Sequence, residues 1–296
     1  MREITIRQAR EEDILQVAEL IAKLNKEKEH HIGYCGEDRD EIINTLETEF
    51  KDHLFENSFV IAERDEKMVG VLGFDGDLEN QHAEIWGPFF SEAGWGKYVI
   101  HMWTKLQKLI PSEIDTISLF PQKNNENCAQ FANGIGFEKQ SEQTILVVRQ
   151  EDVDKVPSDR GTEINEFYEE VRALHDATFP GTYYNGDEIM GRINDLRKVF
   201  TLQEQGKLVG YIYVEAEPQF GEGSIEFFAV HEAYRGKGKG KELLQIGLKW
   251  LFSFEELDKI TLCVNAGNDK AIRLYEHVGF QKKHELVHYI KKCHRR

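Results

Sequence analysis

Two tandem α+β domains are the fold that this sequence predicts. Three observations lead to it. A chain of 296 residues is long enough for two domains of ordinary size. Segments of its first half return in the same order in its second half, and each half alternates strand-like with helix-like patterns. We therefore expect two copies of one domain that contains both a sheet and helices.

An internal repeat sets the domain boundary. Residues 58–74 match 198–214, residues 91–103 match 235–247, and residues 125–139 match 268–282. A period of about 140 residues is that of a duplicated domain and not of a solenoid. Because a polar stretch with Pro157 and Gly161 follows the apolar strand "TILVV", we predict domains 1–152 and 153–296.

The spacing of apolar residues predicts the elements of each half. In the first half, "EITIRQA" predicts a strand and "EEDILQVAELIAKL" an amphipathic helix. The second half opens with the helix "EFYEEVRALHDATF" and has no clear strand before it. It continues with a strand pair, the apolar strand "SIEFFAVH", the helix "KELLQIGLKWLFSF", the strand "KITLCVN" and the helix "NDKAIRLYEHVGF".

Composition narrows the class of protein. The formal net charge is −16, which disfavours a nucleic-acid partner because phosphates need a basic face. No apolar run is long enough to span a membrane, and the start "MREITIRQAR" lacks the apolar core of a signal peptide, so we expect a cytoplasmic protein without a membrane partner. The four cysteines lie far apart, which argues against a metal site or a disulfide framework.

The stretch "RGKGKGK" places four cations among three glycines, between the predicted strand and helix. Glycine permits a sharp turn and leaves backbone N–H groups uncovered, and the start of a helix adds a positive partial charge. This arrangement predicts a phosphate site, although a solvated basic turn is the simpler alternative. The nucleotide-binding patterns G-x-x-x-x-G-K-[ST] and G-x-G-x-x-G are both absent, so a nucleotide enzyme is a weaker hypothesis.

At these residues the sequence resembles the GCN5-related N-acetyltransferase (GNAT) family. Arg235, Gly238 and Gly240 match its signature [QR]-x-x-G-x-[GA], and "NDKAIRLYEHVGF" is similar to its N-x-x-A-x-x-L-Y-x-x-x-G-F segment. The resemblance covers nearly the whole second half and, more weakly, the first. It implies that each domain has a mixed, mainly antiparallel, splayed sheet flanked by helices.

The resemblance implies acetyl-CoA as co-substrate, with no metal. Main-chain groups of the strand before the loop would hold the pantetheine arm, and the loop would surround the pyrophosphate. The cofactor-binding candidates are Phe228, Ala229, Val230, Arg235, Gly236, Lys237, Gly238, Lys239, Gly240, Lys241 and Asn268. For Asn268 a helix N-cap is an equal alternative, since Asn favours that position.

Two residues are the catalytic candidates. Tyr275 matches the family tyrosine that protonates the departing thiolate, and a packed core tyrosine is the alternative. Acetyl transfer needs a neutral amine, whereas an alkyl ammonium has a pKa near 10. Glu226 lies in the apolar strand "SIEFFAV" and is the candidate base, directly or through water. Its alternative is a strand residue that faces solvent or pairs with a cation.

The segment "FPGTYYNGDEIM" corresponds to the family's substrate border. Tyr183, Tyr184 and Asp187 are therefore weak candidates for substrate binding, and turn chemistry explains the same residues. The first half has Ser91 in place of the signature Arg or Gln and Ala132 in place of the tyrosine, while it keeps Gly94 and Asn125. We expect this copy to bind the cofactor weakly or not at all.

The sequence thus predicts an acetyltransferase whose C-terminal domain transfers acetyl from acetyl-CoA to a small-molecule or peptide primary amine by direct attack. The alternative is a non-catalytic acyl-CoA-binding or regulatory module. An acidic chain favours a cationic acceptor such as a polyamine, an aminoglycoside or a lysine-rich peptide. A monomer whose halves form a pseudo-dimer would fit the tandem repeat, but no motif decides the oligomeric state.

Overall fold

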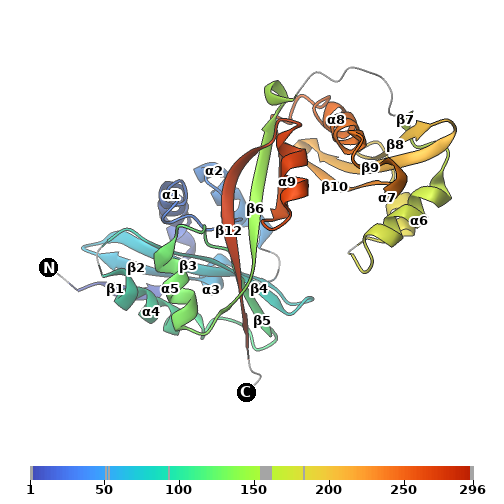
Figure 1. Cartoon of the computed structure of the whole chain (residues 1–296). Helices are drawn as coiled ribbons and strands as arrows, with labels where there is room; N and C mark the ends of the chain where they lie inside the picture. Colours follow the sequence, from blue (N-terminus) through green and yellow to red (C-terminus); the bar gives the residue numbers. More distant parts are fainter. Residues whose placement is uncertain are drawn as a thin grey trace. The chain divides into compact units, whose positions relative to one another are not determined.

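The computed structural model describes residues 3–50, 52, 54–92, 94–153, 162–182 and 184–293 (Figure 1). The predicted linker at Pro157 and Gly161 and the candidate Tyr183 lie outside these residues. The chain packs as two units, Met1–Gln143 with Glu285–Arg296, and Thr144–His284. The predicted repeats 1–152 and 153–296 stay a prediction, because a repeat in sequence and a unit of packing need not end at the same residue.

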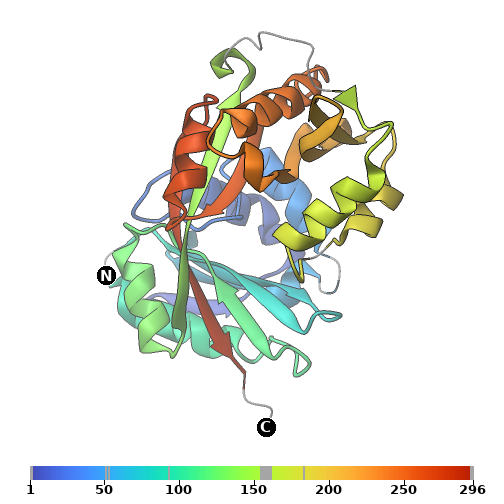
Figure 2. The ribbon, with the colours of Figure 1, turned by 45° about the vertical axis from the view of Figure 1, so that its right-hand side comes forward.

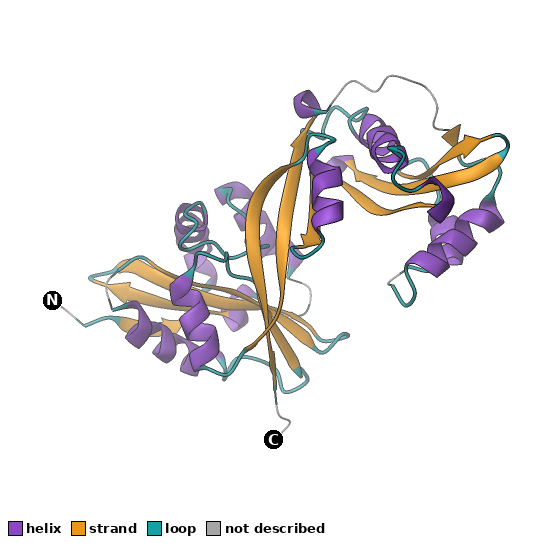
Figure 3. Cartoon of the chain, in the orientation of Figure 1, coloured by secondary structure: helices purple, strands orange, loops and turns teal. Residues whose placement is uncertain are grey.

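Unit 1 contains a mixed sheet with the strand order β1-β2-β3-β4-β5-β12. Every neighbouring pair is antiparallel except β4 and β5, which are parallel. Helices α1 and α2 lie on one face and α4 and α5 on the other (Figures 1 and 3). The elements are β1 (Thr5–Gln8), α1 (Ile14–Asn25), α2 (Arg39–Asn44), α3 (Phe55–Ser58), β2 (Phe59–Arg64), β3 (Lys67–Asp77), β4 (His82–Phe90), α4 (Trp95–Leu106), β5 (Thr116–Leu119), α5 (Glu126–Gly134) and the C-terminal part of β12 (Gln281–Lys292).

The last strand of the chain completes the sheet of unit 1. In β12, Tyr289 lies opposite Leu119 of β5, and Val287 and Tyr289 are buried in the core of this unit. Conversely, Leu146 and Val148 of β6 (Glu138–Arg149) pack in the core of unit 2. The strand that ends the second half of the sequence therefore packs in unit 1, and the strand that ends the first half packs partly in unit 2.

Unit 2 contains a four-stranded antiparallel sheet with the order β10-β9-β8-β7, and its strand β11 pairs with β6, which follows β12 in the order of the other, eight-stranded sheet. Figures 1 and 2 show α8 on one face of the four-stranded sheet and α6 with α7 on the other. The elements are β7 (Thr162–Glu163), α6 (Tyr168–Thr178), α7 (Gly186–Arg192), β8 (Arg197–Glu204), β9 (Lys207–Glu217), β10 (Glu222–Val230), α8 (Lys239–Leu251), β11 (Lys259–Asn265) and α9 (Asp269–Glu276).

The strand that the sequence did not place before α6 is β7. It has two residues, both exposed, and Thr162 lies opposite Thr201 of β8. Such a short polar strand has no alternation of apolar and polar residues, so the sequence carried no signal for it. In the described part of the chain, no helix is both long enough and apolar enough to cross a membrane.

Candidate active site

The loop between β10 and α8 turns at two glycines. Gly236 has φ 73° and Gly238 has φ 76°, a left-handed conformation that side chains with a Cβ disfavour. Gly238 is the N-cap of α8, and Gly240 lies in the first helical turn. Only the first two glycines of the loop therefore adopt positive φ, and Gly240 does not. A Cβ there would lie 3.0 Å from Leu274 Cδ2, so Gly240 permits α9 to approach α8.

The backbone of this loop presents a run of unpaired donors. Among the described residues, the N–H groups of the five residues 236–240 donate to no acceptor, and the first return bond of the helix runs from Glu242 N to Gly238 O at 3.1 Å. Helix N-termini leave such donors open and carry positive partial charge. Several N–H groups that converge at a helix start form a site for an anion such as a diphosphate.

The cations of the loop are held by near neighbours. Arg235 Nε donates to Val230 O at 2.9 Å, and Lys237 Nζ donates to Ala233 O at 2.9 Å. Lys239 Nζ pairs with Glu204 Oε1 at 2.5 Å and Glu242 Oε2 at 3.3 Å. The hydrogen bond to Glu204, with the one to Glu242, raises the pKa of Lys239. The positive charge stays at the loop, but two carboxylates already offset that of Lys239.

Strands β10 and β11 splay apart. Phe228, Ala229 and Val230 pair with β9 on one side, but β10 ends its sheet, and β11 pairs with β6 instead. The other edge of β10 therefore has no hydrogen-bonded strand among the described residues. This confirms the predicted splayed sheet, and it leaves main-chain groups of β10 open to a ligand arm, as edge strands do.

Tyr275 lies at the side of this splay, on α9. Its ring packs edge-to-face against Phe228 and Phe280, with centroids 6.1 and 5.5 Å away. Burial raises the pKa of Tyr275 to about 12, so the hydroxyl stays protonated at neutral pH. The side chain is half-buried, and among the described residues its hydroxyl makes no hydrogen bond. The ring packs as the structural alternative expected, and the hydroxyl is available as a donor.

Asn268 begins α9 as its N-cap. Its side-chain oxygen accepts a hydrogen bond from Ala271 N at 3.2 Å, and Asn125 does the same for Cys128 N at 3.0 Å in the first copy. The structural role of Asn268 is therefore confirmed. Its role in binding the cofactor stays a prediction.

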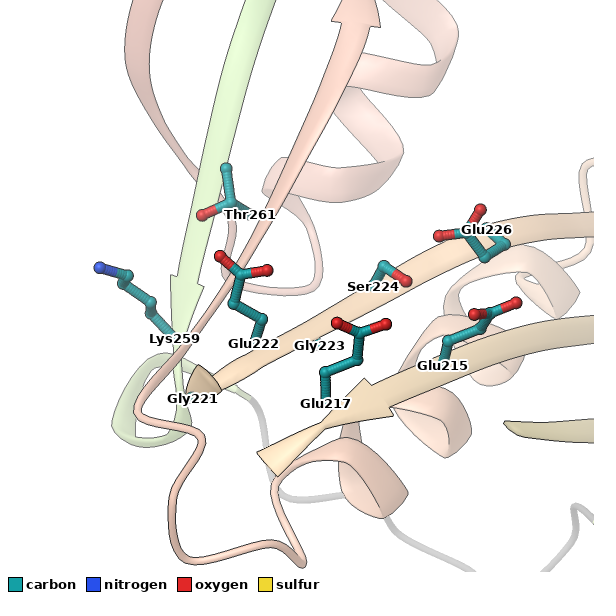
Figure 4. Close-up of a pocket in the computed structure, with 9 residues that line it drawn as sticks. All are labelled: Glu215, Glu217, Gly221, Glu222, Gly223, Ser224, Glu226, Lys259 and Thr261. Carbon is teal, nitrogen blue, oxygen red and sulfur yellow. The ribbon is translucent and has the colours of Figure 1, made fainter. Parts of the chain in front are cut away.

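A pocket of about 350 Å³ opens beside the splay (Figure 4). Its lining comes from the end of β9, the turn after it, the first half of β10 and the start of β11. The lining residues are Glu215, Glu217, Gly221, Glu222, Gly223, Ser224, Glu226, Lys259 and Thr261. Four carboxylates and one ammonium group therefore surround one cavity, which suits a cationic ligand.

Glu226 reaches the pocket through a β-bulge. The register of β10 with β9 shifts between Ile225 and Phe227, which leaves Glu226 between two paired residues. Bulges redirect a side chain and often lie beside active sites. This position explains how one charged residue fits into the apolar segment "SIEFFAV". It also places the Glu226 carboxylate at one end of the pocket, with Glu222 at the other end (Figure 4).

Glu215 is held rigidly at the pocket wall. It accepts hydrogen bonds from Arg192 Nη2 and Arg197 Nε, both at 3.0 Å, and from the Tyr213 hydroxyl. Burial alone would raise the pKa of Glu215, but the bonds from Tyr213, Arg192 and Arg197 lower it. This carboxylate therefore stays ionised and is already neutralised by two guanidinium groups.

The weak candidates for substrate binding lie outside this pocket. Tyr184 stacks under the Arg192 guanidinium, 4.1 Å from its ring centroid, and its carbonyl oxygen lies 2.8 Å from His175 Nε2. Asp187 is exposed and pairs with Arg172. Tyr184 thus supports Arg192, which binds Glu215, whereas Asp187 belongs to the start of α7.

The sequence analysis did not identify most of the pocket residues, although their spacing along two strands carried a signal. Glu215 and Glu217 are two residues apart on one strand, and Glu222, Ser224 and Glu226 follow the same period on the next. Residues at this spacing share one face of a strand. The sequence does not show that the two strands pair in a register that joins these faces.

The first copy has a closed counterpart of this pocket. There β4 and β5 pair directly, with Glu84 opposite Ser118. His82 Nε2 lies 2.9 Å from Ser118 Oγ, which lies 3.1 Å from His288 Nε2. Burial raises the pKa of Glu84 to about 8, so this carboxyl is mostly protonated at neutral pH. A hydrogen-bonded chain therefore occupies the place of the open pocket.

The glycine loop of the first copy has an aromatic neighbour at its turn. Gly94 is the left-handed N-cap of α4, with φ 89°, as Gly238 is of α8. The Tyr98 ring, however, stacks on Phe90 at 5.8 Å, and a Cβ at Gly94 would lie 3.2 Å from it. The backbone turn has been kept while an aromatic side chain packs against it.

Comparison with known proteins finds similarity to one family in the second half of the chain. Residues 164–280 match the family model "Acetyltransferase (GNAT) family". The spermine/spermidine N(1)-acetyltransferase of Bacillus subtilis is 33% identical over 91 residues, which are 29% of this chain and 60% of that protein. The mycothiol acetyltransferase of Corynebacterium aurimucosum is 40% identical over 68 residues, 23% of this chain and 21% of that protein. The second half of the chain is therefore similar to the GNAT family, and its match spans about 60% of the length of the first of these relatives.

Two solved structures share the fold along nearly the whole chain. A GCN5-related N-acetyltransferase from Sphaerobacter thermophilus superposes with a TM-score of 0.67 at 15% identity, covering 98% of this chain and 95% of that one. A tandem GNAT protein from the clavulanic acid biosynthesis pathway has a TM-score of 0.55 at 16% identity and covers 98% of both chains. The predicted tandem fold is confirmed.

Proposed function

We propose that the C-terminal domain is an acetyltransferase that moves the acetyl group of acetyl-CoA to a primary amine by direct attack. The observation that carries this proposal is the run of unpaired N–H groups at residues 236–240, next to the open edge of β10. Together they fit a long ligand with a diphosphate at one end. The chemistry of these donors and of the edge strand agrees with that of the GNAT family, whose model matches residues 164–280.

Different residues of the site would bind different parts of acetyl-CoA. The N–H groups of Gly236, Gly238 and Gly240 would hold the diphosphate, and the edge from Phe228 to Val230 would hold the pantetheine arm. Asn268, at the start of α9, borders the same ligand. When bound, acetyl-CoA supplies the acetyl group as a thioester.

The residues around the splay account for the proton transfers. Glu226 takes a proton from the ammonium group, so that the amine nitrogen can attack the acetyl carbon. The new C–N bond forms and the C–S bond breaks, and Tyr275 gives its hydroxyl proton to the departing sulfur. The second proton that the nitrogen loses returns to Tyr275 through solvent. Because the amine attacks directly, no enzyme nucleophile is needed.

The pocket beside Glu226 is the proposed acceptor site. Its carboxylates favour cationic amines, such as polyamines, aminoglycosides or lysine-rich peptides. The name of the Bacillus subtilis relative, a spermine/spermidine N(1)-acetyltransferase, agrees with this class. Salt should then slow the reaction of cationic amines more than that of neutral ones, because ions screen such attraction.

Two measurements on the full chain test the proposal. Calorimetric titration with acetyl-CoA should give one binding site per chain, and mass spectrometry of an amine panel incubated with acetyl-CoA should show acetylated products. Binding without any product would favour the alternative, a non-catalytic acyl-CoA-binding module. Absence of acetyl-CoA binding, or magnesium-dependent binding of ATP or GTP, would refute both.

A further inference from the structure

We infer that the acceptor is a linear polyamine that lies along β10, with its reacting amine at Glu226 and a second ammonium group between Glu217 and Glu222. This inference rests on the proposed function and specifies the substrate of the same pocket. It makes Glu217 and Glu222 the residues that determine specificity, apart from the catalytic group.

The layout of the pocket is linear. Glu222, Ser224 and Glu226 line it from one strand, and Glu217 and Glu215 lie in register opposite Glu222 and Ser224. Four residues along a strand span about 13 Å. An extended triamine with nine bonds between its terminal nitrogens reaches on the order of 11 Å by standard bond lengths. The two ends of such a chain therefore match the two ends of the pocket.

The charges at the distal end favour a cation. Glu217 and Glu222 are direct cross-strand partners, and like charges in that position destabilise a sheet. An ammonium group between them would remove this cost. Glu215 does not compete for the ligand, because Arg192 and Arg197 already bind it. Lys259 adds one positive charge, which leaves the lining negative.

The first copy shows that this pair is not imposed by the fold. The same register there places Asp77 opposite His82, and Gly73 opposite Trp86 next to the bulge of β4. The positions that correspond to Glu222 and Glu226 therefore carry an imidazole and an indole. The like-charge pair occurs only in the copy with the open pocket. At about 350 Å³ that pocket is at the small end of ligand sites, which suits a slender chain better than a multi-ring amine.

Acetylation of spermidine and of n-butylamine by the full chain, at matched salt, tests the inference. The wild-type protein should prefer spermidine. Glu217→Gln and Glu222→Gln should each raise KM for spermidine about fivefold, the effect of one lost charge contact, and should raise KM for n-butylamine by a smaller factor, because its single ammonium group lies at Glu226. Without ligand, both variants should melt at a higher temperature than the wild type because the like-charge pair is gone. Glu255→Gln, which changes an exposed glutamate outside the pocket, should alter neither quantity.

The outcomes separate this inference from the proposed function. The polyamine assignment is wrong if spermidine reacts no better than n-butylamine. It is also wrong if KM rises by the same factor for both amines in the two variants. In both cases the proposed acetyl transfer still stands. A preference for aminoglycosides or lysine-rich peptides over spermidine would also overturn it. If no amine in the set is acetylated although acetyl-CoA binds, the proposed function itself fails.

Discussion

At the scale of single residues, Tyr275 shows how packing and chemistry combine. Its ring packs against Phe228 and Phe280, and the side chain is half-buried. The sequence supplied the residue and its place in the motif, and the structure adds that this ring lies beside the open edge of β10.

Tyr275→Phe keeps the ring and removes only the hydroxyl. We expect kcat to fall by about two orders of magnitude, the usual contribution of a positioned general acid, with acetyl-CoA affinity unchanged. Stability should change little, because no hydrogen bond is lost. Steady-state kinetics with calorimetry measure both quantities. A variant with wild-type kcat would show that Tyr275 is a packing residue only.

The His82–Ser118–His288 chain gives unit 1 a pH dependence. Burial lowers the pKa of both histidines; for His82, Asp77 and Asp115 act in the opposite direction, and for His288 the nearby His82 lowers it further. Their folded pKa values lie below the unfolded value of about 6.5, so the neutral forms stabilise the fold. This stability is present above pH 6.5 and is lost as the pH falls below it.

Denaturant unfolding of unit 1 between pH 8 and pH 5 tests this dependence. The free energy of unfolding should fall on acidification, and His288→Gln should flatten the curve because one titrating group is gone. His101→Gln changes an exposed histidine of α4 and serves as the matched control, with an unchanged slope. Equal slopes in the wild type and His288→Gln would contradict the assignment.

At the scale of elements, the two glycine loops share a conformation but not a surface. Gly94 and Gly238 are both left-handed N-caps, but the Tyr98 ring lies against Gly94, whereas no side chain lies within 4 Å of a Cβ at Gly238. The repeat in sequence predicted this common turn. It also predicted weaker binding by the first copy from its lost cations, and the packing of Tyr98 agrees with that expectation.

Matched alanine substitutions separate strain from binding. Gly238→Ala and Gly94→Ala should each cost about 1 kcal/mol of stability, because a Cβ disfavours positive φ. Only Gly238→Ala should weaken the binding of acetyl-CoA, since it alters the proposed anion site. Chemical denaturation and calorimetry give the two quantities. The anion site would be misplaced if Gly94→Ala weakened binding as much as Gly238→Ala, or if neither did.

At the scale of the whole molecule, the exchange of terminal strands ties the end of the chain to unit 1. Tyr289 of β12 is buried beside Leu119 of β5, far away in sequence. The pairing makes residues 285–292 part of the first core, although the repeat assigns them to the second copy. The boundary near residue 152 is therefore the predicted end of the first repeat, and it is not the boundary between the two packed units.

Tyr289→Ala should destabilise unit 1 by about 3 kcal/mol, the lower range for removing a buried aromatic side chain. Faster hydrogen exchange should appear in β5 and β4 and leave β8 to β10 unchanged. Lys292→Ala, at an exposed position of the same strand, is the control. Exchange that increased in unit 2 instead would show that β12 belongs to the other core.

The sequence by itself predicted the tandem fold, the order of most elements, a glycine turn between β10 and α8, the candidates Tyr275 and Asn268 from a motif, and the candidate Glu226 from its place in an apolar strand. These depend on local spacing, which a single chain displays. Only the tertiary structure decided that β7 exists, that Gly240 makes room for Leu274, that β12 completes unit 1, and that Glu215, Glu217 and Glu222 share a pocket with Glu226. Each of these depends on which strands pair and in which register, and that is set by long-range packing that no local pattern encodes.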